Sequence, residues 1–148
     1  MIRLVIVDDM PDIRNYLAEE LAAASEQFSV VGAAEDGTEA VKLVDSLLPD
    51  VVLMDIQMKT RTEGIYAIRI IHEKHPDIKC IALTIHEDDE LIFQAYLAGA
   101  ADYIIKTRSI DTIKNSILAV VNNRLLLRPE VGQRLIQAVS YTHLEPTR

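Results

Sequence analysis

Short apolar runs alternate along the chain with segments in which apolar residues recur every three or four positions. The runs occupy residues 2–7, 28–34, 51–54, 78–83 and 102–105. Apolar runs of this length are typical of strands that are buried on both faces of a parallel sheet. The segments between them have the apolar spacing of helices, which connect parallel strands. The pattern therefore predicts an α/β fold, with a doubly wound five-stranded parallel sheet and helices on both faces.

Proline, glycine and acidic residues predict where several of these helices begin and end. Pro11 suits the first turn of the helix that follows the first strand, and Pro76 closes the third helix. Asp36 can cap the second helix, and Gly99 ends the fourth. The last helix is predicted over residues 110–121. These signals agree with the order of elements that the apolar pattern indicates.

Composition narrows the class of protein. A chain of 148 residues fits one domain, and its lone Cys80 cannot form an internal disulfide. No stretch approaches the roughly 20 apolar residues of a membrane span, and the N-terminus runs into strand pattern instead of a signal peptide. The net charge of −8 argues against nucleic-acid binding by the body of the domain. We therefore expect a cytoplasmic protein that binds no membrane and, by itself, no nucleic acid.

Charged side chains follow three of the predicted strands at the point where each strand ends. Asp8 and Asp9 follow the first strand, Asp55 the third and Lys106 the fifth. The carboxyl ends of parallel strands meet at one edge of the sheet, so these side chains are expected to share a pocket. Close carboxylates repel one another unless a cation lies between them, and Mg²⁺ suits oxygen ligands. A single Asp after a strand can simply cap a turn, but the whole set indicates a site that handles a phosphoryl group.

These residues lie within motifs that resemble, in order, those of a response-regulator receiver domain. The matching fragments span about residues 1–122 and are Val7-Asp8-Asp9, Leu53-Met54-Asp55-Ile56-Gln57-Met58, Leu83-Thr84 and Ala100-Ala101-Asp102-Tyr103-Ile104-Ile105-Lys106. The resemblance implies a flavodoxin-like fold in which a partner histidine kinase phosphorylates Asp55. A carboxylate is a competent nucleophile for this reaction, because it forms an acyl phosphate.

The same resemblance assigns roles to the other residues of the motifs. Four groups would bind Mg²⁺: the carboxylates of Asp8, Asp9 and Asp55 and the backbone carbonyl of Gln57, with Asp8 able to act through a water molecule. Thr84 and Lys106 would bind the phosphoryl oxygens. Tyr103 would be the switch aromatic that turns inward when Thr84 moves, although an ordinary half-buried strand tyrosine is the alternative. Phosphorylation would then shift a conformational equilibrium and favour a homodimer.

Two positions are predicted to tune the lifetime of the acyl phosphate. Gln57 lies two residues after Asp55, and His86 lies two residues after Thr84, so both would flank the path of an attacking water. Gln57 can orient a water but cannot take its proton, whereas neutral His86 can accept it. We therefore expect dephosphorylation to accelerate when His86 loses its proton. The alternative is a solvent-facing His86 with no role in hydrolysis.

The chain departs from the family's pattern around the site. Lys59 replaces the usual proline four residues after the phosphorylated Asp, and Gly64 lies one position later than is typical, which leaves the shape of that loop open. Thr107 stands where a proline commonly follows the Lys, so a cis peptide need not exist there. Ile85 is bulkier than the usual residue. It could narrow phosphoryl access or point away.

The chain is expected to divide into three segments. Residues 1–122 form the receiver domain, residues 123–138 a linker with a short helix, and residues 139–148 a non-native or disordered tail. The linker resembles that of NarL/FixJ-type regulators, where a helix-turn-helix DNA-binding domain follows. Codons for residues 139–144 would resemble a transposon-end adapter. We therefore interpret the chain as a truncated transcriptional regulator.

Other functions are weighed against the receiver. A complete single-domain receiver would signal through protein contacts alone. A phosphatase of the haloacid-dehalogenase type needs a second Asp two residues after the nucleophile, where Gln57 stands. A flavodoxin-like FMN carrier needs a phosphate loop after the first strand, where Asp8 and Asp9 would repel phosphate. As a receiver, the chain would not be an enzyme beyond catalysing its own phosphorylation and dephosphorylation.

Overall fold

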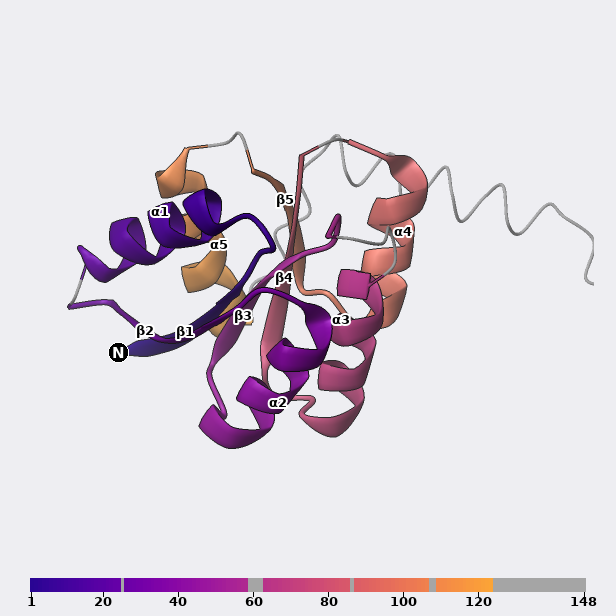
Figure 1. The fold of residues 1–148 in the computed structure, drawn as a ribbon, viewed down its shortest axis with the longest axis horizontal. Coiled ribbons are helices and arrows are strands. Elements are labelled where there is room, and N and C mark those ends of the chain that lie inside the picture. The colour runs from indigo at the N-terminus through magenta and orange to yellow at the C-terminus, as the bar shows by residue number, and fades with distance from the viewer. Residues whose placement is uncertain (25, 59–62, 86, 107–108, 124–148) are drawn as a thin grey trace, which may run out of the picture.

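Strands and helices alternate along the chain in the computed structural model (Figure 1). The structure describes residues 1–24, 26–58, 63–85, 87–106 and 109–123. Its elements are β1 (Ile2–Val7), α1 (Pro11–Ala22), β2 (Phe28–Ala34), α2 (Gly37–Leu47), β3 (Val51–Asp55), α3 (Glu63–Lys74), β4 (Lys79–Thr84), α4 (Asp89–Ala98), β5 (Asp102–Ile105) and α5 (Ile110–Val121). None of the described helices is both long and apolar enough to cross a membrane.

The strands pair in parallel in the order β2-β1-β3-β4-β5. The chain steps from β1 outward to β2 and then returns past β1 to β3, so the order reverses between β1 and β3. In open α/β sheets, ligands bind in the crevice beyond the carboxyl ends of the strands at such a reversal. The predicted five-stranded, doubly wound parallel sheet is confirmed.

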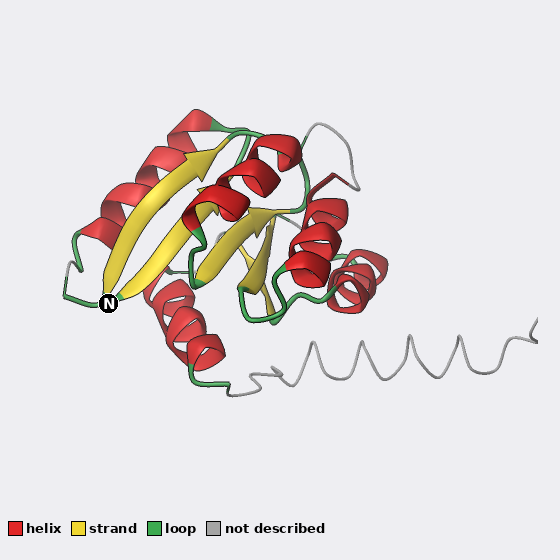
Figure 2. Ribbon diagram, turned by 90° about the horizontal axis from the view of Figure 1, so that it is seen from below, coloured by secondary structure: helices red, strands yellow, loops and turns green. Residues whose placement is uncertain are grey.

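Helices cover both faces of the sheet because successive strand residues point to opposite sides. Leu4 and Ile6 of β1 pack with apolar residues of α1 and α5, whereas Val5 and Val7 pack with those of α2, α3 and α4. Figure 2 shows the two helical layers with the sheet between them. The apolar runs of β1, β3 and β4 are therefore strands buried on both sides, whereas β2, at the edge of the sheet, is only partly buried.

The helix boundaries follow the local signals in the sequence. Pro11 is the first residue of α1, and the Asp36 side chain accepts a hydrogen bond from the Glu39 N–H, 2.8 Å away, at the start of α2. Asp88 caps α4 through hydrogen bonds from two backbone N–H groups. Gly99 ends α4 with a φ of 115°, in the left-handed region that favours glycine. The predicted caps at Asp36 and Gly99 are confirmed.

Strand β4 begins and ends one residue later than predicted. Ile78 belongs to the turn before the strand, where its N–H donates to the His75 carbonyl, 3.0 Å away. At the other end, Thr84 pairs with Ile105 of β5 and is part of the sheet. Strand pairing therefore holds Thr84 beside the residue that precedes Lys106.

Several predictions concern residues that the structure does not describe. Residues 124–148 include all of the predicted tail and all of the predicted linker except Asn123. Lys59, His86 and Thr107 also lie outside the described residues. The predictions for the linker, the tail and the role of His86 in hydrolysis therefore stay predictions.

Candidate functional site

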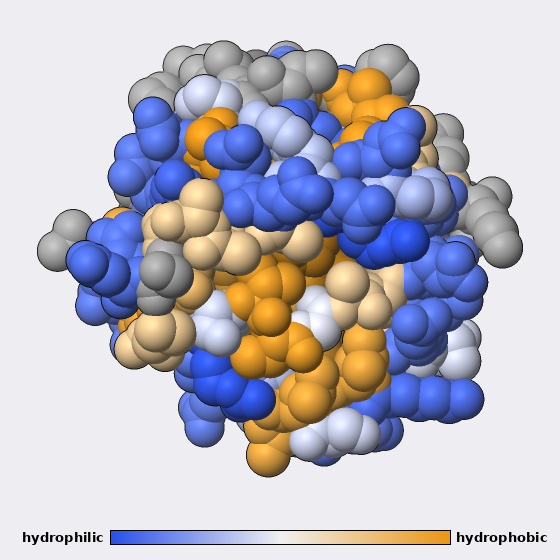
Figure 3. Space-filling view, turned by 60° about the vertical axis from the view of Figure 1, so that its left-hand side comes forward, coloured by the Kyte–Doolittle hydropathy of each residue, from blue (hydrophilic) through white to orange (hydrophobic). Residues whose placement is uncertain are grey.

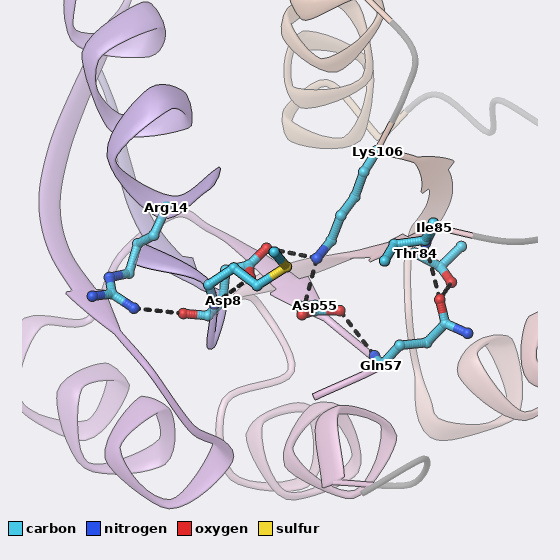
Figure 4. Close-up of polar contacts among 8 residues, drawn as sticks. Asp8, Arg14, Asp55, Gln57, Thr84, Ile85 and Lys106 are labelled. Carbon is cyan, nitrogen blue, oxygen red and sulfur yellow. Dashed lines mark hydrogen bonds and ion pairs between the residues drawn. The ribbon is translucent and has the colours of Figure 1, made fainter. Parts of the chain in front are cut away.

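The side chains that follow β1, β3 and β5 meet at one edge of the sheet. The Lys106 ammonium lies 2.6 Å from Asp8 Oδ2 and 2.9 Å from Asp55 Oδ2, so it bridges the two carboxylates (Figure 4). Asp8 is fully buried and Asp55 is 1% exposed. Strand pairing causes this convergence, because the ends of β1 and β3 lie side by side in the register that pairs Val7 with Met54.

A third carboxylate completes an acidic cluster. Asp8, Asp9 and Asp55 each offer an oxygen atom within 4.8 Å of the other two. Three carboxylates against the one ammonium of Lys106 leave a formal charge of −2, from −3 + 1. Among the described residues, Asp8 Oδ2 has no hydrogen-bond partner and only the ion pair with Lys106. A buried oxygen with spare lone pairs, in a site of this charge, fits a divalent cation with oxygen ligands.

The environment of Asp55 acts on its charge in two directions. Burial raises the pKa of Asp55 above its ordinary value, and the nearby Asp8 carboxylate adds to the rise. The Gln57 N–H, which donates to Asp55 Oδ1 across 2.9 Å, and the Lys106 ammonium act in the opposite direction and lower the pKa. Lys106 and the Gln57 backbone therefore stabilise the carboxylate form of Asp55.

Two groups that sequence reasoning missed hold Asp8 in place. The Met10 N–H donates to Asp8 Oδ1 across 2.9 Å, and the Arg14 guanidinium donates to the Asp8 backbone carbonyl across 2.7 Å. Figure 4 shows Arg14 turned toward Asp8 from α1. The sequence signal for Arg14 was a cation in the first turns of the helix that follows the acidic loop. Together these contacts fix the loop between β1 and α1.

Gly64 has a steric role that the sequence did not indicate. A Cβ atom at Gly64 would lie 2.2 Å from the Asp55 carbonyl oxygen and 2.6 Å from the Ile56 Cα. These neighbours are backbone atoms, which cannot move aside without displacing the end of β3. The absence of a side chain at Gly64 therefore allows the start of α3 to approach the backbone of Asp55 closely.

The Gln57 side chain points away from Asp55 and toward the end of β4. Its Oε1 accepts hydrogen bonds from the Thr84 hydroxyl and from the Ile85 N–H, the latter across 2.9 Å (Figure 4). Thr84 is fully buried. The backbone of Gln57 lies next to Asp55, so the structure brings Gln57 and Thr84 into the predicted site.

Tyr103 is turned into the protein. Only 2% of it is exposed, and it packs with the residues between the sheet and α2, α3 and α4. Burial raises the pKa of Tyr103 to about 12, although a hydrogen bond with the Thr84 side chain acts to lower it. Tyr103 is therefore a fully buried strand residue and not a half-buried one, and it contacts the threonine that the switch hypothesis requires. Its role in switching stays a prediction.

An apolar cavity of about 410 Å³ opens beside Lys106. It lies between α1, α5 and the ends of β4 and β5, and its lining includes Met10, Tyr16, Ile85 and Ile113. Ile85 lines this cavity and is 43% exposed. Its backbone N–H donates a hydrogen bond to the Gln57 side chain. Figure 3, which brings forward the side of the molecule where α1 lies in Figure 1, shows a hydrophobic area bordered by polar side chains.

Known proteins are similar in sequence to this chain over most of its length. Residues 4–118 match the family model of the response regulator receiver domain. The chain is 34% identical to the transcriptional regulatory protein YdfI of Bacillus subtilis, over all of this chain and 68% of that protein. It is 35% identical to the transcriptional regulatory protein DegU of Brevibacillus brevis, over 92% of this chain and 57% of that protein. The chain thus spans 57% to 68% of the length of these two relatives.

Solved structures share the fold. A two-component response regulator of the LuxR family from Aurantimonas superposes with a TM-score of 0.82 at 26% identity, covering 95% of this chain and 99% of that chain. The response regulator domain of Thermotoga maritima CheB superposes with a TM-score of 0.71 at 29% identity, covering 87% and 99%. With the ordered motifs and the parallel sheet, these matches show that the chain belongs to the family of response regulator receiver domains of two-component systems.

Proposed function

We propose that the chain accepts a phosphoryl group on Asp55 from a sensor histidine kinase and changes conformation in response. The observation that carries this proposal is the buried Asp55 carboxylate, which belongs to the acidic cluster and lies 2.9 Å from the Lys106 ammonium. In the transfer, an Asp55 oxygen forms a bond to phosphorus while the bond from phosphorus to the donor's histidine nitrogen breaks. The electron pair of that bond stays on the nitrogen.

The acidic cluster supports a role for Mg²⁺. The ligands would be the Asp8, Asp9 and Asp55 carboxylates and the backbone carbonyl of Gln57, which lies two residues after Asp55 in the chain. When bound, Mg²⁺ supplies positive charge that neutralises the transferred phosphoryl group. Lys106 supplies a second positive charge, which is held 2.9 Å from Asp55 Oδ2.

Thr84 and Tyr103 would carry the switch. A phosphoryl oxygen on Asp55 would accept a hydrogen bond from the Thr84 hydroxyl, which is buried at the end of β4. Because Tyr103 is hydrogen-bonded to Thr84, a shift of that hydroxyl changes the contacts of Tyr103 on the face formed with α4. Phosphorylation would thereby alter the surface of α4, β5 and α5 and favour a homodimer.

We further propose that the chain is not an enzyme beyond its own phosphorylation and dephosphorylation. A phosphatase of the haloacid-dehalogenase type needs a general acid two residues after the nucleophile, and the amide of Gln57 cannot serve as one. Its oxygen is moreover engaged by Thr84 and Ile85. Phosphate esters would therefore not be turned over.

Output and partners are proposed from the relatives. YdfI and DegU are named transcriptional regulatory proteins, which supports a transcriptional output through a DNA-binding domain beyond residues 123–138. A single-domain receiver that signals through protein contacts is the alternative. The apolar cavity beside Lys106 gives a kinase a surface to bind within reach of Asp55.

Labelling with a small phosphodonor tests the proposal. In the presence of Mg²⁺ the chain should gain one phosphoryl group that is stable in acid and released by hydroxylamine, as expected for an acyl phosphate. Asp55→Asn should abolish the label, and Asp111→Asn, at an exposed carboxylate in the first turn of α5, should retain it. Equal labelling of the Asp55→Asn variant would contradict the proposal.

A further inference from the structure

Two hydrogen-bond donors at the end of β4 converge on one oxygen atom. The Thr84 hydroxyl and the Ile85 N–H both donate to Gln57 Oε1, as Figure 4 shows. Each residue has one such hydrogen to give. The pair therefore forms a ready site for a single oxygen acceptor, and the Gln57 side chain supplies that acceptor.

Gln57 is also hydrogen-bonded to Asp55, the proposed phosphoacceptor. The Gln57 N–H donates to Asp55 Oδ1 across 2.9 Å, so the backbone of this residue contacts Asp55 while its side chain contacts β4. Before a phosphoryl oxygen on Asp55 can accept a hydrogen bond from the Thr84 hydroxyl, that hydroxyl must therefore break its hydrogen bond to Gln57. An anionic phosphoryl oxygen is the stronger acceptor, because hydrogen bonds to charged groups are stronger than those to a neutral amide.

We propose that the Gln57 side chain is a latch that holds Thr84 and Ile85 in the unphosphorylated protein and that the phosphoryl group must displace. This inference rests on the proposed role of Asp55 and adds to it a residue that sets the cost of switching. Thr84 is also hydrogen-bonded to Tyr103, so two successive hydrogen bonds connect Gln57 through Thr84 to Tyr103. Release of Gln57 and movement of Tyr103 are then linked.

Binding of beryllium trifluoride, an unreactive analogue of the phosphoryl group, measures this cost without any contribution from hydrolysis. Gln57→Met keeps the size of the side chain and the backbone carbonyl but removes the acceptor. At saturating Mg²⁺ this variant should bind the analogue roughly tenfold more tightly, the effect of one or two neutral hydrogen bonds that no longer have to break. Gln27→Met, at an exposed glutamine before β2, should bind like the wild type.

A double-mutant cycle tests whether Thr84 carries the effect. In a Thr84→Ala background only the Ile85 N–H still binds Gln57, so the gain from Gln57→Met should shrink to about threefold or less. Amide exchange gives a second readout in the absence of any ligand. The Ile85 N–H should exchange faster in Gln57→Met, and Gln57→Glu, which keeps an acceptor oxygen, should restore its protection.

The outcomes separate this inference from the proposed function. If the wild type does not bind the analogue in an Asp55-dependent manner, the role of Asp55 is wrong and the latch is wrong with it. If the wild type binds but a folded Gln57→Met variant binds no more tightly, the latch alone is overturned. Unchanged exchange of the Ile85 N–H in Gln57→Met would overturn it as well.

Discussion

The charge around Asp55 depends on the ammonium group of Lys106. Only 7% of the Lys106 side chain is exposed, and its nitrogen contacts oxygens of both Asp8 and Asp55. A metal ion would need the same oxygens. Lys106 is therefore both a stabilising partner of the carboxylates and a competitor of any cation that binds them.

We predict that Lys106→Met binds Mg²⁺ roughly tenfold more tightly than the wild type in the absence of a phosphodonor, because the site becomes more negative and both oxygens lose their competitor. Lys42→Met, at an exposed lysine of α2, is the matched control and should leave the affinity unchanged. Calorimetric titration measures both. Weaker binding by the Lys106 variant would contradict the competition.

Tyr103 gives a prediction in the alkaline range. Burial raises the folded-state pKa of Tyr103 to about 12, above the ordinary value of 10.0, so its contribution to stability is present below about pH 10 and is lost as pH rises toward 12. Tyr103→Phe should therefore reduce the fall in the free energy of unfolding across that range. Denaturant titrations at a series of alkaline pH values measure it, with phenolate absorbance as a second readout.

Tyr66→Phe is the control for this experiment. Tyr66 is 63% exposed on α3, so its phenol is in contact with solvent in both the folded and the unfolded states. The slope of stability against pH should be the same in Tyr66→Phe and the wild type. A slope that is equally unchanged in Tyr103→Phe would show that its phenol does not titrate late in the folded protein.

The positions of residues along the strands were sufficient to predict part of the site. The directions of the side chains could not be predicted in this way. Asp8, Asp55 and Lys106 converge because each follows a strand of one parallel sheet, which apolar runs reveal. The orientation of Gln57 and the depth of Tyr103 depend on packing against residues distant in the sequence. The spacing of residues along the sequence gives no information on the orientation of Gln57 or on the burial of Tyr103.

Among the elements, α3 is set against the end of β3 through Gly64. Gly64→Ala would place a methyl group onto backbone atoms of Asp55 and Ile56, so the strand end or the helix has to shift. We predict a loss of roughly 1–3 kcal/mol in the free energy of unfolding, as is usual for overpacking, together with slower phosphorylation. Denaturant unfolding and the rate of labelling measure the two effects.

Gly32→Ala is the matched control in β2. The nearest atom to its added methyl group is the Leu47 Cδ1, 2.8 Å away, at the flexible end of a side chain that can rotate aside. Stability should fall less than in Gly64→Ala, and the labelling rate should not change. Equal effects of the two substitutions on labelling would contradict a special role for the contact between α3 and Asp55.

Element boundaries were predictable where a residue dictates the backbone. Proline begins α1, Asp36 caps α2 and glycine ends α4, because each has a backbone or side-chain property that the position requires. Strand β4 was misplaced by one residue, since its start depends on pairing with β3 and its end on pairing with β5, and not on its own sequence. The close approach at Gly64 was likewise invisible, because its partner is a backbone carbonyl nine residues earlier.

For the whole molecule, the acidic cluster is a source of instability that a cation should relieve. We predict that Mg²⁺ raises the free energy of unfolding, by about 2.7 kcal/mol at one hundred times its dissociation constant. Asp9→Asn should remove most of this gain, because it removes one of the three carboxylates of the cluster. Thermal unfolding with and without Mg²⁺, and after chelation, measures the effect.

A second acidic group provides the control. Glu35, Asp36 and Glu39 also offer oxygens close to one another, but Glu35 and Glu39 are exposed. Glu39→Gln should leave the Mg²⁺ effect intact, because exposed carboxylates are already solvated by water. If Glu39→Gln reduces the effect as much as Asp9→Asn, the metal does not bind where the strands end.

The identity of the phosphorylated residue is the central claim, and chemical mapping tests it most directly. Borohydride reduces an aspartyl phosphate to homoserine, which peptide mass spectrometry can locate in the chain. After labelling with a small phosphodonor and Mg²⁺, homoserine should appear at position 55, in the peptide that contains the end of β3. Homoserine at Asp8, Asp9 or any other carboxylate, with none at position 55, would contradict the account.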